Sequence, residues 1–259
     1  LLNPNKKIEF DEKIKKEQEN QRIAFEKKSD DDLVGYEEAY KNRLKLDWKN
    51  EDIAVPSFIG LKQIIDYSLD DIRKYIDWTF FFSVWEIRGS FPKLLNDPIR
   101  GKVAKELFEN ANLLLDEIIE KKLLRANVAY GFWPAKSVKD NIVLYKNKER
   151  TDELVKFSML RQKKIKNGIT LSLSDFIAPK NSEVDDYIGA FAVTAGINAK
   201  KLSETYEKEN DDYNAIMVKA IADRLAEALA ELMHRRVRKE WGFPDKNNTT
   251  NEDLIKEKY

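Results

Sequence analysis

A long amphipathic stretch near the end of the chain constrains the fold most strongly. From Asp211 to about Trp241, apolar side chains recur every three or four residues, basic side chains fill the last turns, and Gly242 comes next. This spacing puts one apolar stripe on a helix, cations suit the negative end of its dipole, and glycine commonly ends helices. The sequence therefore predicts one long helix with a single core-facing side. Its stripe consists of Tyr213, Ile216, Met217, Ala220, Ile221, Leu225, Ala228, Leu229, Leu232 and Met233.

A second helix and a group of strands precede it. Gly101–Arg125 carries a stripe with helical spacing, which begins at Val103 and Leu107. After Asn127 the chain changes to short segments rich in β-branched and aromatic residues, separated by glycine and proline, which predict strands. Their links are too short for crossover helices, so we expect antiparallel pairing and an α+β domain. The predicted strands are 128–133, 141–145, 154–160, 169–177 and 187–194.

The first part of the chain differs in composition. Asn5–Asp32 consists almost entirely of charged and amide residues with isolated apolar ones, which predicts a charged helical arm. Such an arm could be an interdomain linker or a solvated helix lying on its own domain. We assign residues 1–50 to it and residues 51–259 to the main domain. Glu51–Ile64, which contains Pro56 and Gly60, is expected to be extended.

The charge balance and two scarce residue types exclude several function classes. Lys plus Arg and Asp plus Glu both number 46, so no basic excess favours nucleic-acid binding. The chain has no cysteine, which excludes disulfides and thiolate chemistry and fits a reducing compartment. Its one histidine, His234, leaves little room for a catalytic triad. The longest apolar stretch, 187–197, is too short to cross a bilayer, so we expect no membrane contact. We also expect a cytoplasmic monomer.

Few residues suggest chemistry on their own. Ser68, followed by two acids, predicts the start of a short helix that reaches about Asp77. Asp77 precedes the aromatic block 78–91, where a carboxylate could meet a purine nucleoside or an ammonium group, although such blocks more often form core. Glu227, Glu231 and His234 share one helix face and could suggest a metal site. A polar, solvated helix face is the favoured interpretation of those three, since a carboxylate-bridged site needs a second histidine, which the chain lacks.

Several strings together resemble one known family. YIDWTFFFSVWEIRGSFPKLL (Tyr75–Leu95) resembles the opening of the activation domain of cobalamin-dependent methionine synthase. GFWPA (Gly131–Ala135) and LSDFIAPKNSEVDDYIGAFAVTAG (Leu173–Gly196) are similar to its G-x-[WF]-P-A and D-F-[IV]-A-P elements. The stretch Asp211–Phe243 resembles its long helix, and Asn251–Tyr259 resembles the segment after that helix. Several such strings in order are more specific than any single motif.

This resemblance implies a fold and a role. The fold would be a C-shaped α+β domain with a twisted antiparallel sheet flanked by helices. The domain would bind S-adenosylmethionine and support reductive remethylation of cob(II)alamin, so it would be part of a methyltransferase without catalytic residues of its own. Cobalamin would be held by a neighbouring domain, zinc only elsewhere in the parent enzyme, and the electron would come from flavodoxin or a similar reductase.

The resemblance also implies ligand residues. Asp77 and Glu227 match the two acids of the family's S-adenosylmethionine pocket, and Glu257 stands where a further acid is expected. Acids suit a ligand whose ammonium and sulfonium are both cationic. Phe80 departs from the family's usual proline. The family's R-x-A-P-G-Y-P segment would come after Tyr259, outside this sequence, so the alternative is a docking-only domain with an incomplete ligand site.

Overall fold

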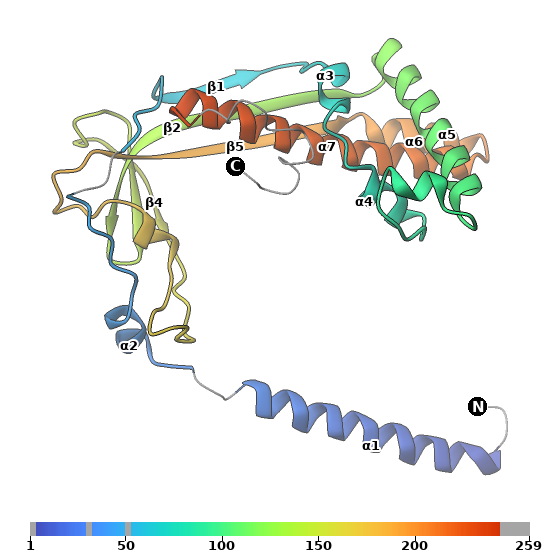
Figure 1. Cartoon of the computed structure of the whole chain (residues 1–259), viewed down its shortest axis with the longest axis horizontal. Helices are drawn as coiled ribbons and strands as arrows, with labels where there is room; N and C mark the ends of the chain where they lie inside the picture. The colour runs from blue at the N-terminus through green and yellow to red at the C-terminus, as the bar shows by residue number, and fades with distance from the viewer. Residues whose placement is uncertain (1–3, 30–32, 50–52, 244–259) are drawn as a thin grey trace. The chain divides into compact units, whose positions relative to one another are not determined.

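The chain folds into helices around one antiparallel sheet, as expected for an α+β protein. The computed structural model describes residues 4–29, 33–49 and 53–243 (Figure 1). The helices are α1 (Pro4–Ser29), α2 (Tyr36–Lys41), α3 (Leu69–Arg73), α4 (Trp78–Val84), α5 (Gly101–Glu120), α6 (Ala199–Lys208) and α7 (Asp212–Trp241), with 3₁₀ turns η1 (Lys93–Asn96) and η2 (Leu173–Phe176). The strands are β1 (Gly60–Ile64), β2 (Arg125–Val138), β3 (Asn141–Tyr145), β4 (Glu153–Ser158) and β5 (Asp186–Ile197).

The structure divides into two compact units, which we describe separately. Unit 1 comprises residues 1–51, 136–143 and 155–184, and unit 2 comprises residues 52–135, 144–154 and 185–259. The chain first passes from unit 1 to unit 2 after residue 51, next to the predicted start of the main domain. It then returns to unit 1 twice, at residues 136–143 and 155–184. β2, β3 and β4 each contribute residues to both units. The assignment of residues 1–50 as a separate arm or linker stays a prediction.

Unit 2 is built on two long-range strand pairings and one long helix. β2 pairs antiparallel with β1, where Leu61 lies opposite Gly131, and with β5, where Phe132 lies opposite Gly189. The full sheet order is β1-β2-β3-β4, with β5 also paired to β2. α7 packs along β5 and also contacts α3, α4, α5 and α6 (Figure 1). The core of this unit therefore lies between α7, the neighbouring helices and the sheet.

The ends of α7 follow the predicted signals. The Asp211 carboxylate accepts a hydrogen bond from the backbone N–H of Asn214, and Gly242 ends the helix with a φ of 100°. Leu225, Leu229 and Met233 are fully buried. The predicted stripe is wrong at its first two members, since Tyr213 and Ile216 are 41% and 47% exposed. Val103 of α5 is likewise 58% exposed, although its neighbours Gly101 and Ala104 are buried, so it lies off the buried face of that helix.

Several predicted boundaries differ from the structure. α5 ends at Glu120 instead of Arg125, because Lys122 takes a left-handed φ of 52° and the chain enters β2. The predicted helix from Ser68 already ends at Arg73. α6 was not predicted. β1, β2, β3, β4 and β5 overlap the extended or strand segments predicted from the sequence.

The predicted strand at 169–177 is wrong. The Ser172 and Asp175 side chains and backbones form a reciprocal capping box, which favours the 3₁₀ turn η2 over an extended chain. In unit 1 the predicted charged helix is present as α1. None of the helices in the described ranges is both long and apolar enough to cross a bilayer.

Candidate functional site

Asp77 stands at the start of α4. Its carboxylate oxygen Oδ1 accepts a hydrogen bond of 2.8 Å from the backbone N–H of Thr79, so the side chain caps the helix. The hydroxyl of Thr79 in turn accepts the backbone N–H of Phe91 at 3.1 Å. Asp77 is half-buried, and only Oδ1 takes part in the cap. The cap therefore fixes the carboxylate in place and leaves its second oxygen for another donor.

The aromatic block behind Asp77 is mostly core. Phe81 and Phe82 are fully buried, and Trp78 packs edge-on against Phe81 and Phe108 with ring centroids 5.2 and 4.7 Å apart. This packing confirms the simpler of the two interpretations for these rings. It also holds α4 rigidly, which a ligand-binding carboxylate at its N-terminus requires.

Phe80 is the exposed aromatic residue of α4. Its ring is 61% exposed, and the guanidinium carbon of Arg224 from α7 lies 5.7 Å from the ring centroid. This distance is within the range of a cation–π contact. The Nε of Arg224 is buried and has no hydrogen-bond partner among the described residues. The contact therefore joins α4 and α7 through packing and charge.

Glu227 lies on α7, three residues beyond Arg224, and is exposed. Residues three apart share a helix face, so Glu227 and Arg224 lie on neighbouring turns of one side of α7. Asp77 similarly precedes Phe80 by three residues. The Phe80–Arg224 contact thus lies about one helical turn along the chain from each predicted acid. Within the described ranges, neither acid forms an ion pair, so both can meet a cationic ligand.

Glu257, the third predicted acid, lies outside the described residues, as does the whole of Asn251–Tyr259. The histidine on α7 packs edge-on against Phe191, with ring centroids 4.9 Å apart. No group of three or more His, Asp or Glu side chains in the described part of the chain could hold a metal ion. Glu227, Glu231 and His234 therefore do not form the metal centre considered as an alternative.

Sequence reasoning missed two features of this region. The capping role of Asp77 toward the Thr79 backbone was not predicted, although Asp before a helix is a common N-cap residue. Arg224 had no signal of its own, because its contact with Phe80 spans a long stretch of chain. The region thus holds the fixed, half-buried carboxylate of Asp77 and the exposed carboxylate of Glu227. Both lie near the Phe80–Arg224 contact between α4 and α7.

Comparison with known proteins defines the class to which this arrangement belongs. Residues 68–259 match the family described as "Vitamin B12 dependent methionine synthase, activation domain". The chain belongs to this family and is a reactivation domain of methionine synthase, a methyltransferase. A similar solved structure is the MetH reactivation domain bound to AdoHcy, with 42% identity and a TM-score of 0.85. That match covers 88% of this chain and 70% of the other. The family resemblance and the α+β fold are thereby confirmed.

Proposed function

We propose that this domain binds S-adenosylmethionine next to the α4–α7 contact, with Asp77 and Glu227 facing the ligand's cationic groups. One observation carries the proposal: two carboxylates without a cationic partner among the described residues flank one helix contact, in a domain similar to one solved with AdoHcy. AdoHcy is the demethylated form of S-adenosylmethionine. It retains the ammonium group, which either carboxylate can bind.

The cap geometry supports separate roles for the two acids. The Asp77 carboxylate is held by the Thr79 backbone at 2.8 Å, so it suits a fixed hydrogen bond from an ammonium or a ribose hydroxyl. Glu227 is exposed and free to rotate, so it suits longer-range attraction of the sulfonium. Glu257 would add a third acid. The chain's residues bind and orient the methyl donor, and they hold no group that takes up the methyl.

The same proposal includes the rest of the reaction. Cobalamin on a neighbouring domain would accept the methyl group after a one-electron reduction by flavodoxin or a similar reductase, and AdoHcy would be the product. We further propose a cytoplasmic monomer, which agrees with the absence of cysteine. Zinc is proposed only for other parts of the parent enzyme.

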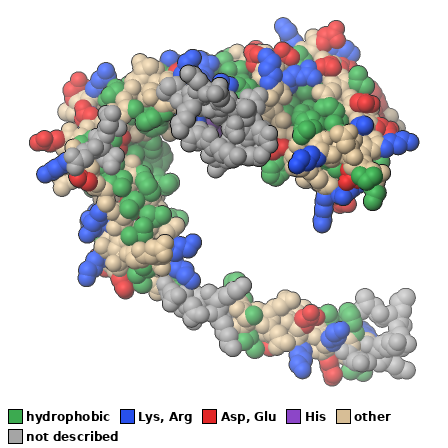
Figure 2. Space-filling view, viewed as in Figure 1, with side chains coloured by type: hydrophobic (Ala, Val, Ile, Leu, Met, Phe, Trp, Pro, Cys, Tyr) green, Lys and Arg blue, Asp and Glu red, His purple; other side chains and the backbone are tan. Residues whose placement is uncertain are grey.

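An apolar surface supports docking of the cobalamin domain on unit 2. Hydrophobic side chains gather on the visible face of this unit around α4 and α5 (Figure 2). Val84, Ile99 and Leu113 are 52%, 86% and 68% exposed. Exposed apolar groups gathered on one face are typical of interaction surfaces. This surface also supports the second candidate function, docking without ligand binding.

Isothermal titration with S-adenosylmethionine tests the first function. We expect Asp77→Asn and Glu227→Gln each to weaken binding about tenfold, equivalent to about 1.4 kcal/mol, while the exposed Glu109→Gln on α5 leaves it unchanged. The same titration is made with a form extended past Tyr259 by its native sequence. If neither form binds, the docking-only function replaces the proposal. Binding that is insensitive to both substitutions would exclude these two acids as ligand residues.

A further inference from the structure

Unit 1 contains a hollow that the proposed function does not use. Its volume is about 460 Å³, and the 137–139 turn and the 174–181 segment form part of its wall. Four cationic side chains and two aromatic ones line it: Arg43, Lys45, Lys139, Lys180, Tyr40 and Trp48. We call this hollow the basic pocket. Its size lies in the range of small-molecule sites.

The charges of the basic pocket are not balanced within the described residues. None of its four cations is paired with a carboxylate in the part of the chain that the structure describes. The carboxylate in its wall, Asp175, already accepts hydrogen bonds of 2.6 and 2.9 Å from Arg161. A surface with several unpaired cations and no available anion attracts an anionic ligand.

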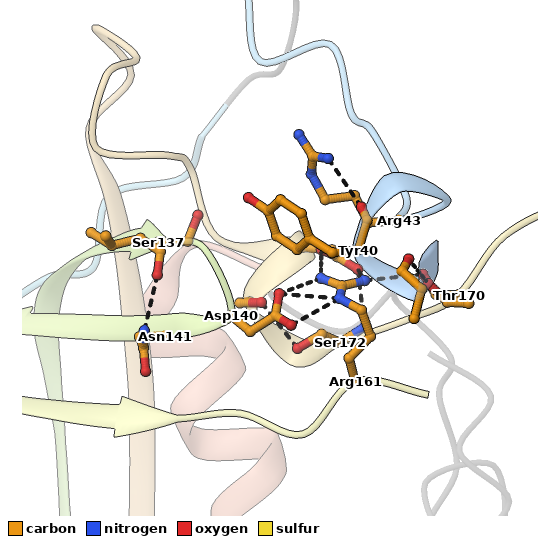
Figure 3. Close-up of polar contacts among 12 residues, drawn as sticks. Tyr40, Arg43, Ser137, Asp140, Asn141, Arg161, Thr170 and Ser172 are labelled. Atoms are coloured by element: carbon orange, nitrogen blue, oxygen red, sulfur yellow. Dashed lines mark hydrogen bonds and ion pairs between the residues drawn. The ribbon is translucent and has the colours of Figure 1, made fainter. Parts of the chain in front are cut away.

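The wall is held by a polar network that fixes its shape. Arg161 is buried and donates hydrogen bonds to Asp140 (Figure 3) and to Asp175. Its guanidinium carbon also lies 5.4 Å from the centroid of the Tyr40 ring. The Ser137 hydroxyl donates to the carbonyl of Ile177 at 2.8 Å, which ties the end of β2 to the wall. The pocket is therefore formed before any ligand arrives.

The aromatic lining points to a flat group on the ligand. The Arg43 guanidinium lies over the Tyr40 ring, with its carbon 4.3 Å from the ring centroid. Trp48 is half-buried and stacks on no other aromatic ring among the described residues. An indole face beside unpaired cations suits a planar ring that bears negative groups, since stacking and charge attraction then act on one molecule.

We propose that the basic pocket binds a small phosphorylated molecule with a planar ring, of the size of a mononucleotide. Lys45, Lys139 and Lys180 contact the phosphate groups, Arg43 adds a fork of donors, and Trp48 stacks on the ring. This site lies wholly within unit 1, whereas Asp77 and Glu227 lie in unit 2. The proposal is therefore independent of S-adenosylmethionine binding.

Trp48 gives a direct readout. It is the only tryptophan in unit 1, because Trp78, Trp85, Trp133 and Trp241 all belong to unit 2. We titrate the full chain with ADP, pyrophosphate and adenosine in the presence of saturating S-adenosylmethionine, which occupies any adenosine-binding site in unit 2. We expect ADP to quench Trp48 and to bind at least tenfold more tightly than adenosine or pyrophosphate, with an affinity that falls as salt increases. Trp48→Phe removes the quenching.

Matched charge reversals complete the test. Lys139→Glu with Lys180→Glu should weaken ADP binding at least tenfold, while Lys163→Glu with Lys166→Glu, exposed in the same unit but outside the pocket, should not. Circular dichroism confirms that all variants are folded. Three results would overturn the proposal: no quenching by ADP, equal weakening by both pairs of substitutions, or binding of a short poly-aspartate peptide as tightly as ADP. The last would assign the pocket to acidic protein segments.

Discussion

The guanidinium carbon of Arg224 on α7 lies 5.7 Å from the ring centroid of Phe80 on α4. This contact holds together the two helices that carry Asp77 and Glu227. An exposed cation–π contact contributes about 0.5–1 kcal/mol. We expect Phe80→Leu to lower the free energy of unfolding by this amount and to weaken S-adenosylmethionine binding a few-fold, as measured by urea unfolding and calorimetry. Ile99→Leu, at a more exposed position, is the control. Unchanged binding in Phe80→Leu would show that the contact does not position the site.

Asp77 has a structural role and a proposed binding role, and two substitutions separate them. Asn keeps an oxygen that can accept the Thr79 N–H, whereas Ala removes the cap, which costs about 1 kcal/mol. We expect Asp77→Asn to lose ligand affinity with little loss of stability, and Asp77→Ala to lose both. Thermal unfolding without ligand measures the stability and calorimetry the affinity. If the variants lose affinity in proportion to their loss of stability, Asp77 acts only as a helix cap and does not bind the ligand.

The buried network of unit 1 predicts a large stability effect. Burial opposes the charged form of Arg161, but hydrogen bonds to Asp175 and Asp140 outweigh it and raise the pKa of Arg161 further. Removing one member of such a group leaves uncompensated charge, which costs about 3–5 kcal/mol. We expect Arg161→Met to lower the free energy of unfolding by that amount. The triple variant that adds Asp140→Asn and Asp175→Asn should recover most of this stability. Urea unfolding is followed by tryptophan fluorescence, and the part of the signal that Trp48→Phe removes reports on this unit.

Gly131 explains part of the G-F-W-P-A element in steric terms. A Cβ at this position would lie 2.3 Å from the backbone oxygen of Gly60 on the paired strand β1. Backbone atoms of a paired strand cannot move aside cheaply, so we expect Gly131→Ala to lower the free energy of unfolding by about 1–3 kcal/mol. Gly35→Ala, where no atom lies within 4 Å, serves as the control. Thermal denaturation compares the two, and similar melting temperatures would contradict the steric explanation.

One exposed ion pair gives a pH-dependent prediction. Asp66 accepts hydrogen bonds from Arg125 at the start of β2, and these hold the pKa of Asp66 below its ordinary value of 3.8. A lowered carboxyl pKa adds stability above the unfolded-state pKa, and this stability disappears as pH falls through the folded-state pKa. The stability difference between wild type and Asp66→Asn should thus be full above about pH 5 and vanish in stronger acid. Urea titrations at several pH values test this. A constant difference would place the effect in the backbone conformation instead.

Helix spacing and capping residues in the sequence correctly predicted the helix ends that those residues themselves determine. The spacing in α7, its Asp211 cap and Gly242 produced correct ends, and Ser68 correctly marked the start of α3. The strand predicted at 169–177 is wrong because the Ser172–Asp175 capping box, whose residues stand in the sequence at capping-box spacing, favours a 3₁₀ turn there. α6 was not predicted because its charged stretch has few apolar residues, and it packs against α7 and β5, which lie elsewhere in the sequence.

The functional residues divide in the same way, into those with a local sequence signal and those without one. Asp77 was noticed beside its aromatic block, but its assignment and that of Glu227 came from the family resemblance. The basic pocket and Arg161 were missed entirely. Charged residues in a strongly charged chain are typical of a solvated surface, and nothing local shows that Arg161 is buried between two acids. Only the tertiary pairing of distant segments makes that arrangement visible.

Unit 1 is assembled from three separate stretches, and the strands β2, β3 and β4 pass from one unit to the other. No single cut of the chain, by a protease or in a gene, releases either unit intact. Unit 1 therefore cannot be moved to another protein as one contiguous segment. A transfer of unit 1 to another protein would have to include the strands that it shares with unit 2.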